Sequence, residues 1–582
     1  MLDTAHRRVG LLIGLAALLG LAGGVAAWAL LKLIAVLTNL ALFHRWATEL
    51  PSFAGWHPTW TLIPIAAAGG LAISLLSLKW PAIRGHGIPE TMEVVLTRHS
   101  RIPPGIALAK PASAAIAIGT GGPFGAEGPI IVTGGALGSL AGQLLHVSPA
   151  ERKILLSCGA AAGMAATFGS PIAAVMLAIE LLLFEFSSRA LIPLIVSSSV
   201  AAGVHSLLLE PGPLFSVPAH DYSGLSRLPV FAVVGLLCGL MAVVIARGLF
   251  FTEALYRRLP VGEFWHPVIG ACGFALVGLM VPQALGVGYD AIGDVLHSRL
   301  ALGTLLTLGI AKLVAWWVAL GSGTSGGTLA PMLLISGCFG GALGLLLEQW
   351  MPWLDLSPGA VALVSMAATF GAATGATFAA IVFLFELTGD YQVILPLMLA
   401  TVMATFVTRA LMAETLMTEK LARRGVKVGR AYEVDALRHT LVRDAMTARV
   451  ETLPSDATVA EAKALLKASS HHAYPLVDGE GRCAGIVARS DLLLDTSQPF
   501  ERVSEICEDD PVMVDGSDTL AGALETMLAE GVEQLAVVDS DERLTGILTR
   551  TDILKVRLGL VEQETRQTGW LPLRRGVAMD RS

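Results

Sequence analysis

A long series of apolar segments, many of them too short to cross a membrane, constrains this chain most. A helix needs about 20 apolar residues to span the hydrocarbon core of a bilayer. Several runs here are shorter and are interrupted by glycine, such as residues 106–118 and 361–370. Such segments are typical of transporters whose helices stop partway through the membrane, near a central binding site. The pattern predicts a mainly α polytopic membrane domain with broken helices.

The apolar character does not extend over the whole chain. Of the 582 residues 54% are hydrophobic and 15% are charged, with a mean hydropathy of +0.67, which is too apolar for a soluble protein of this length. Acidic residues are sparse before about residue 431 and frequent after it. We therefore expect a transport domain over residues 1–430, a soluble domain over residues 431–558 and a disordered tail over residues 559–582.

Basic residues indicate how the chain is oriented. His6, Arg7 and Arg8 precede the first apolar run, and residues 422–430 read ARRGVKVGR. Because cytoplasmic segments carry an excess of Lys and Arg, we expect both termini in the cytoplasm. The first run is too long for a signal peptide. The sequence predicts an integral multi-pass protein of an inner or plasma membrane.

Metal-binding and catalytic patterns are missing from the sequence. The six cysteines show neither paired nor metal-ligand spacing, so no disulfide framework and no zinc site is indicated. The apolar segments carry no metal-binding His/Glu spacing and no nucleophile–base set. We therefore expect no enzyme activity, no metal site, no required cofactor and no nucleic-acid partner.

One carboxylate stands among glycines at residues 119–129, which read GTGGPFGAEGP. Broken backbone and an ionisable group at membrane depth imply a cavity or pore. The glycines allow sharp turns, and Pro129 suits the first turn of the helix that follows. The free amides at that helix start would face an anion. Glu127 and a dissolved anion would then compete for one positive pocket; the alternative is a capping glutamate in an interfacial loop.

The membrane domain contains an internal repeat. PIAAVMLAIEL at residues 171–181 aligns with TFAAIVFLFEL at 377–387, and the glycine-rich turn before Ile130 resembles GSGTSGGTLAPM at 321–332. Two halves of similar build around one central site are predicted, the alternative being coincidence among Ala, Gly and Leu runs. Glu180 and Glu386 occupy equivalent places, where helix capping is favoured over proton carriage.

The soluble domain repeats at a constant offset. VRDAMT at Val442 aligns with VSEICE at Val503, and GIVARSDLL at Gly485 aligns with GILTRTDIL at Gly546. Each unit alternates short β-like runs with helical ones, which predicts an α/β module present twice, over residues 442–495 and 503–557.

Three short motifs carry a resemblance to a known family. GHGIPE at residues 85–90, GAEGP at 125–129 and GTLAP at 327–331 occur in order, each with a helix start after it. With the paired cytoplasmic repeats, the chain resembles the CLC family of chloride channels and chloride/proton antiporters, followed by tandem CBS domains. The resemblance implies two inverted-type repeats, a homodimer in the lipid bilayer, and one pathway per subunit for chloride or a similar small anion. The ion would be held weakly enough to leave.

The resemblance assigns roles to individual residues. Glu127 matches the gating glutamate, and Thr328 and Leu329 match positions whose backbone amides contact the central ion. Ala126 stands where an arginine is common. The anion-binding residues implied are His86, Gly87, Ile88, Gly125, Ala126, Thr328, Leu329 and Met417.

Three residues depart from the family pattern. His86 replaces the usual ion-coordinating serine; its N–H can donate to an anion, and a protonated ring would bind more strongly near pH 6, although a purely structural histidine is an equal alternative. Met417 replaces the central tyrosine, so the inner gate would be apolar, with the hydroxyls of Thr415 and Thr418 nearby. Leu181 replaces the internal glutamate that relays protons in antiporters.

Leu181 bears on the transport mechanism. Without a titratable group at this position, a proton path would need water or Glu180, so uncoupled or weakly coupled, channel-like anion flux is favoured. A chloride/proton antiporter with a non-standard internal path is the alternative. A CBS-linked magnesium channel is a distant one, because it would need several carboxylates and the broken helices offer amide ends and only Glu127.

The resemblance to CBS domains implies binding of an adenine nucleotide, that is ATP, ADP or AMP. In that family a Thr or Ser three residues before an Asp serves phosphate and ribose. The second repeat supplies Thr549 and Asp552, whereas the first has Ala488 before Asp491. One site is thus better equipped than the other; the alternative is a module that serves dimerisation and stability alone.

Overall fold

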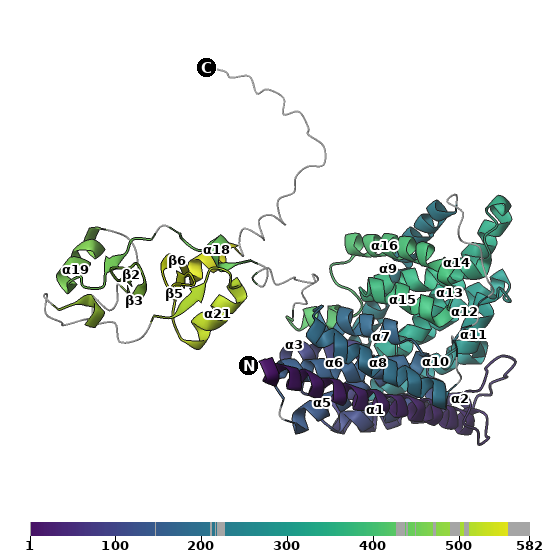
Figure 1. Ribbon diagram of the computed structural model, residues 1–582. Helices are drawn as coiled ribbons and strands as arrows, with labels where there is room; N and C mark the ends of the chain where they lie inside the picture. Colours follow the sequence, from purple (N-terminus) through teal and green to yellow (C-terminus); the bar gives the residue numbers. More distant parts are fainter. Residues whose placement is uncertain are drawn as a thin grey trace, which may run out of the picture. The chain divides into compact units, whose positions relative to one another are not determined.

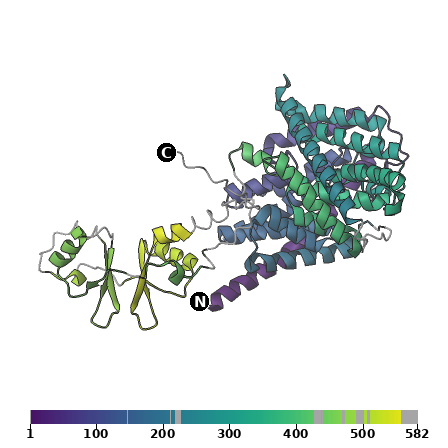
Figure 2. The same ribbon diagram turned by 90° about the horizontal axis from the view of Figure 1, so that it is seen from above.

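The computed structural model divides the chain into two compact units, Met1–Tyr432 and Glu433–Ser582 (Figures 1 and 2). The residues that it describes are 2–145, 147–209, 212, 214–215, 217, 227–426, 437, 440–448, 450–468, 473–488, 501–505 and 511–556, with the side chains of 2–9, 466–468, 488 and 505 left out. Asp491, the predicted tail and the N-terminal basic side chains lie outside this description.

The described part of the first unit is built from helices packed side by side (Figure 1). Its first half contains α1 (Leu2–Leu42), α2 (Leu62–Lys79), α3 (Ile88–Thr97), α4 (Ile106–Gly119), α5 (Glu127–Leu144), α6 (Pro149–Phe168), α7 (Pro171–Ala178), a π-helical turn η2 (Ile179–Leu183) and α8 (Ser188–Leu208). Its second half contains α9 (Leu228–Arg258), α10 (His266–Met280), α11 (Tyr289–Leu296), α12 (Leu302–Gly321), α13 (Leu329–Trp350), α14 (Pro358–Thr374), α15 (Thr377–Thr388), α16 (Ile394–Leu411) and α17 (Glu419–Arg423).

The first unit contains both long and short helices, as the apolar pattern predicted. Among the described residues, eight helices are long and apolar enough to cross a membrane, whereas α4, α14 and α15 are apolar but shorter. Glycines in the left-handed region end several of them: Gly169 after α6 (φ 66°) and Gly375 after α14 (φ 81°). The broken helices of the predicted fold class are thus confirmed.

Helices α5 and α6 pack so closely that their backbones touch. A Cβ atom added to Gly134 of α5 would collide with the carbonyl oxygen of Gly159, and one added to Gly159 would collide with that of Gly134. Small residues that admit such approach are the usual means of helix association in a membrane, where apolar burial gives no drive. The contact fixes the direction in which α5 leaves the turn that carries Glu127.

The two halves of the first unit are joined through equivalent residues. The Glu386 carboxylate accepts hydrogen bonds from the backbone N–H groups of Ile172 and Ala173 at 3.0 and 2.7 Å, at the start of α7. The Glu180 carboxylate accepts from those of Phe378 and Ala379 at 3.1 and 3.0 Å, at the start of α15. Each half thus caps a helix of the other, which relates the halves by an approximate two-fold axis.

Helix α11 has no counterpart among the apolar segments of the sequence. It spans eight residues, Tyr289–Leu296, and carries two aspartates, so neither its length nor its hydropathy marks it as a membrane helix. It begins after Gly288, which has a positive φ of 86°. This helix brings Tyr289, which the sequence did not single out, next to Glu127.

The second unit contains two small sheets of the same build. In the first, β1 (Leu453–Pro454) pairs parallel with β2 (Ala473–Val477), which pairs antiparallel with β3 (Cys483–Ala488). In the second, β4 (Met513–Asp515), β5 (Gln534–Val538) and β6 (Leu544–Thr549) repeat this order. Helices α18 (Val442–Ala445), α19 (Val459–Ala468) and α21 (Leu520–Ala529) accompany them. The predicted α/β repeat is confirmed.

The two sheets of the second unit contact each other through one apolar cluster. Cys483, Ala536 and Val538 are buried together, and the backbone N–H of Cys483 donates to the carbonyl of Glu542 at 3.2 Å. Figure 2 shows the two hairpins side by side. The repeats therefore fold as a pair.

Candidate functional site

The three glycine-rich motifs, far apart in sequence, meet in the first unit. Gly85 forms a parallel bridge with Ser325, and Gly125 forms an antiparallel bridge with Gly327. The second bridge has two hydrogen bonds: Gly125 N donates to Gly327 O at 3.3 Å, and Gly327 N donates to Gly125 O at 2.8 Å. Because these two glycines occupy equivalent places in the halves, the approximate two-fold axis passes through this point.

Backbone atoms of the motifs approach too closely for any side chain to fit between them. A Cβ atom on Gly128 would collide with the carbonyl oxygen of His86, and one on Gly87 would lie 2.9 Å from the carbonyl oxygen of Gly128. Gly87 also has a positive φ of 95°. Glycine is required here because the turns are packed backbone to backbone.

Three helix starts follow these turns directly. Gly87, Ala126 and Thr328 are the capping residues of α3, α5 and α13. The first N–H groups of a helix have no partner within it, and the peptide dipoles give this end a partial positive charge. Helix starts that converge in this way form a site that suits an anion through backbone amides.

Glu127 lies where α5 and α13 begin. Its side chain is buried, with 1% exposure, and its Oε1 accepts a hydrogen bond from the Tyr289 hydroxyl at 3.3 Å. A Cβ atom on Gly125 would collide with the Glu127 carboxylate, and one on Gly327 would lie 2.6 Å from Oε2 of Glu127. The carboxylate therefore covers the glycine bridge and fills the space between the two helix starts.

Three buried polar atoms around this point have no hydrogen-bond partner within the described part of the chain. They are Nδ1 of His86, Oε2 of Glu127 and Oγ1 of Thr328. An unpaired polar atom in a protein interior costs roughly 1–3 kcal/mol, so such an atom in a native structure usually serves a function. Donors from His86 and Thr328 would suit an anion, and an unpaired carboxylate oxygen would suit a proton.

Two buried lysines, which the sequence reasoning missed, hold the turns in place. Lys110 Nζ donates to the carbonyls of Ile83 and Gly85 at 2.7 and 2.8 Å, and Lys312 Nζ donates to that of Gly286 at 2.7 Å. Both side chains are fully buried, and Lys312 interacts electrostatically with Glu127. The sequence offered one sign of their importance. Lys110 precedes Gly125 by the same number of residues as Lys312 precedes Gly327, so the two lysines occupy equivalent positions in the two halves.

The segment around Met417 is buried and ordered by its own hydrogen bonds. Met417 has no exposed surface, and Leu416 N donates to the carbonyl of Ala373 at 2.9 Å. The hydroxyl of Thr418 donates to Glu414 at 2.6 Å and accepts from the backbone N–H of Thr415 at 3.0 Å. The two hydroxyls suggested as substitutes for a tyrosine are thus engaged within their own turn.

Leu181 lies beside a cavity of about 640 Å³. Glu180, Glu414 and Thr418 line the same cavity, together with apolar residues of α15 and α16. Glu180 is committed to capping α15 through both of its oxygens. The cavity therefore has carboxylates on its wall although its Leu181 side is apolar.

In the second unit the predicted nucleotide residues lie next to each other. The Thr549 hydroxyl donates to Asp552 Oδ2 at 2.7 Å, and Lys555 Nζ lies 3.2 Å from Oδ1. Thr549 ends β6 and Asp552 stands in the helical turn that follows, which fits a Thr–Asp pair at a strand-to-helix corner. The Thr549 hydroxyl and the Asp552 carboxylate are already hydrogen-bonded, so a ribose would have to share these hydrogen bonds or replace the present partners.

Comparison with known proteins identifies the fold and the family. A family model described as voltage gated chloride channel matches residues 69–409, more than half of the chain. The chain belongs to the CLC family. A CBS domain model matches the second unit twice, over residues 442–495 and 503–559. These matches confirm the resemblance on which the sequence predictions rested.

Relatives of this CLC protein carry the names of transporters and channels. It is 31% identical to the H(+)/Cl(-) exchange transporter ClcA of Vibrio cholerae serotype O1 over 53% of its own length and 67% of that protein. It is 26% identical to the chloride channel protein CLC-f of Arabidopsis thaliana, over 91% of its own length and 77% of that protein.

Solved structures show the same fold. A slow cyanobacterial Cl-/H+ antiporter aligns with a TM-score of 0.63 at 25% identity, over 71% of this chain and 97% of that one. A eukaryotic CLC transporter aligns with a TM-score of 0.59 at 19% identity, over 93% of this chain and 97% of that one, which shows the fold alone. This CLC protein is a multi-pass membrane protein for anion transport and is not an enzyme. The membrane domain of this chain matches the chloride-channel family model, so the magnesium-channel alternative is set aside.

Proposed function

We propose that Glu127 gates a chloride pathway in which its carboxylate and the anion compete for one site. The observation that carries the proposal is the position of the Glu127 carboxylate over the Gly125–Gly327 bridge, between the starts of α5 and α13. An anion that replaced the carboxylate would meet the backbone amides at the same two helix starts. Protonation of Glu127 removes its charge and with it the competition, so acid conditions open the path.

We further propose that His86 and Thr328 contribute donors to the anion once Glu127 has moved. Both side chains are buried and each has a polar atom without a partner in the described residues. Gly87, Ile88, Gly125, Ala126 and Leu329 contribute backbone at the same turns, and Met417 provides an apolar inner gate. A gate of this kind holds the anion weakly enough for conduction.

Flux without strict proton coupling is the transport mode that we propose. Leu181 cannot carry a proton, and Glu180 is hydrogen-bonded as a helix cap. Two observations favour the second candidate, a chloride/proton antiporter: relatives at 31% identity are named H(+)/Cl(-) exchange transporters, and Glu414 lines the cavity beside Leu181. We propose a homodimer, as the family resemblance implies, with both termini in the cytoplasm, as the basic residues near each end of the membrane domain indicate.

The second unit is proposed to bind an adenine nucleotide at Thr549 and Asp552. Its support is the CBS family match and the contact between these two residues. Calorimetry with ATP on the full-length protein tests the proposal: Thr549→Ala should weaken binding, and undetectable ATP, ADP and AMP binding by the unaltered protein would refute it.

Chloride efflux from liposomes across a pH series tests the gate. The unaltered protein should pass more chloride as the pH falls, because protonation of Glu127 ends the competition. Glu127→Gln should remain active and lose this pH dependence, since an amide is not an anion. Glu185→Gln, a half-exposed carboxylate paired with Lys153, is the control and should keep the pH dependence. A Glu127→Gln variant that still responds to pH in the same way would exclude Glu127 as the gate.

A further inference from the structure

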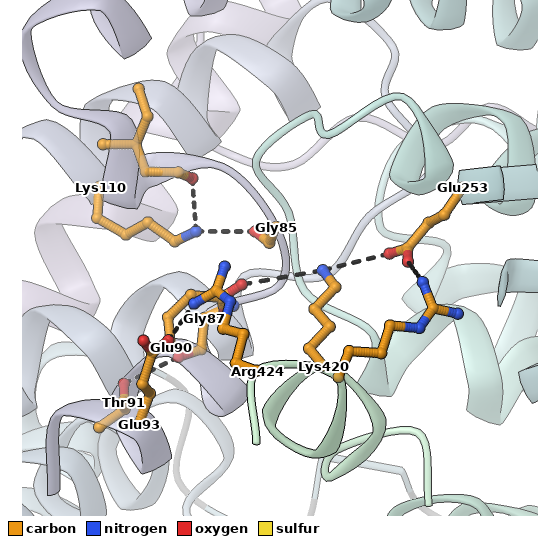
Figure 3. A network of polar contacts seen from close by, with 11 residues as sticks. Gly85, Gly87, Glu90, Thr91, Glu93, Lys110, Glu253, Lys420 and Arg424 are labelled. Atoms are coloured by element: carbon orange, nitrogen blue, oxygen red, sulfur yellow. Dashed lines mark hydrogen bonds and ion pairs between the residues drawn. The ribbon is translucent and has the colours of Figure 1, made fainter. Parts of the chain in front are cut away.

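Helix α17 is attached to the rest of the first unit by ion pairs on two sides. Lys420 Nζ lies 3.3 Å from Glu253 Oε1 of α9, and Arg423 Nη1 lies 3.9 Å from Glu253 Oε2. On the other side Arg424 pairs with Glu93 of α3. Figure 3 shows α17 between these two partners, with Lys420 directed toward the turn at Gly85 and Gly87. The helix starts two residues after Met417, so these pairs hold the Met417 segment to both halves of the domain.

Lys420 is also linked to the turn that carries His86. Its Nζ lies 3.9 Å from Glu90 Oε1, and Glu90 Oε2 accepts a hydrogen bond from the backbone N–H of Gly87 at 2.8 Å. A Cβ atom built on Gly85 would lie 3.3 Å from Lys420 Nζ. One carboxylate therefore joins the ammonium group to the backbone of the His86 turn.

The opposite side of this turn is held by Lys110. Its ammonium group donates hydrogen bonds to the carbonyls of Ile83 and Gly85, while the Glu90 carboxylate accepts one from the backbone N–H of Gly87. His86 lies between these anchors, with its ring buried and its Nδ1 without a partner in the described residues. The bridge between Gly85 and Ser325 also holds this turn, and the two anchors fix its backbone before and after His86.

We propose that Lys420 is a positioning residue for the anion pocket, acting through Glu90 to hold the His86 turn in register with the Met417 segment. This inference rests on the proposed function, because it takes His86 and Met417 as parts of the pathway. Lys420 touches neither the anion nor Glu127. Its loss would let the two segments shift relative to each other, and the pocket would discriminate less well between anions of different size.

A competing explanation for Lys420 predicts different results. A partly exposed ammonium group could simply attract anions by its charge. In that case Lys420→Met should lower flux and Glu90→Gln should raise it, since the second change leaves more positive charge. If Lys420 positions the turn, both changes break the same link and should act in the same direction. The double variant then should be no worse than the more affected single variant, as for two members of one unit.

The experiment measures chloride and nitrate efflux from liposomes for Lys420→Met, Lys420→Arg, Glu90→Gln and the double variant Lys420→Met/Glu90→Gln. Lys420→Met and Glu90→Gln should each change the chloride-to-nitrate flux ratio by about threefold to tenfold, as expected for loss of a coupled contact. Lys420→Arg should restore the ratio because it keeps the charge and the reach. A purely structural role would lower the amount of folded protein and leave this ratio unchanged.

Lys153→Met is the matched control. Lys153 forms an ion pair of the same length, 3.9 Å, with Glu185, and its side chain is 27% exposed against 26% for Lys420. It contacts no glycine turn of the pathway. An unchanged flux ratio in Lys420→Met and Glu90→Gln, opposite effects of these two variants, or the same change in Lys153→Met would each overturn the proposal. Glu127→Gln in the same series reports on the gate itself, so a failure of the proposed function is seen separately.

Discussion

Of the three departures from the family pattern, His86 is the one whose contacts bear most directly on how an anion would be bound. A buried histidine that serves the structure normally pairs its ring, as His205 does through Nδ1 and the carbonyl of Ala166 at 2.7 Å. His86 lacks a partner for Nδ1 within the described residues, although its ring is just as buried. His266 is also buried with an unpaired ring nitrogen in the described residues, so the anion-donor proposal rests on the unpaired Nδ1 together with the place of His86 directly before the capping residue of α3.

His86→Ala should lower chloride flux about tenfold, because the anion loses a donor in a site with few others. His86→Ser should recover most of the flux, since a hydroxyl can donate from a similar place. Stopped-flow efflux measurements with a fixed amount of reconstituted protein provide the comparison, and His205→Ala is the control for loss of a buried ring. Equal flux in His86→Ala and the unaltered protein would show that the ring serves packing alone.

Single residues differ in how well the sequence could predict them. Glu127 was found because a carboxylate among glycines conflicts with its apolar surroundings. Tyr289 lies in a short polar helix that no apolar pattern marks, and its contact with Glu127 joins residues 162 positions apart. Lys110 lies in the shorter apolar helix α4 and Lys312 in the long apolar helix α12, and a single lysine in an apolar helix does not show which carbonyl it will contact.

At the scale of elements, the reciprocal caps explain why α7 and α15 can be short. A helix start buried in a membrane protein needs acceptors for its first N–H groups. Glu386 supplies them to α7 and Glu180 supplies them to α15. The repeat of the two glutamates was visible in the sequence. That each caps the other half's helix was not, because it depends on how the halves face each other.

Glu386→Gln should lower the free energy of unfolding by about 1 kcal/mol, the usual size of a lost cap. The glutamine amide keeps one acceptor oxygen for one of the two backbone N–H groups of α7. Its NH₂ group would face the other N–H, so that hydrogen bond is lost. Thermal unfolding in detergent measures the effect, with the exposed Glu185→Gln as control. Chloride flux per folded molecule should not change, and a large loss of flux at unchanged stability would show that Glu386 serves transport.

At the scale of the whole molecule, the composition predicted a membrane part and a soluble repeat, and the two compact units follow this division. The sequence could not show which carboxylates share a cavity. Glu414 was not singled out, yet it lines the same cavity as Leu181, together with residues of α15 and α16. It is a second candidate, beside Glu180, for the proton path that proton-coupled exchange would need.

A chloride gradient across liposomes should drive no uphill proton movement in the unaltered protein, because Leu181 interrupts the internal path. A pH-sensitive dye inside the liposomes records the protons while chloride efflux is followed in parallel. Uphill proton movement would establish the antiporter instead. Glu414→Gln and Glu180→Gln would then identify the carrier, with Glu185→Gln as the control that should not alter coupling.

The bridge between Gly125 and Gly327 also bears on how this protein is made. The turn that carries Glu127 is completed by backbone from a residue synthesised about 200 positions later. At roughly 5–20 residues per second, Glu127 is synthesised about 10–40 seconds before Gly327. During that interval the carboxylate has no finished pocket. The first half alone, expressed as a fragment, should therefore insert into a membrane without forming a conducting gate.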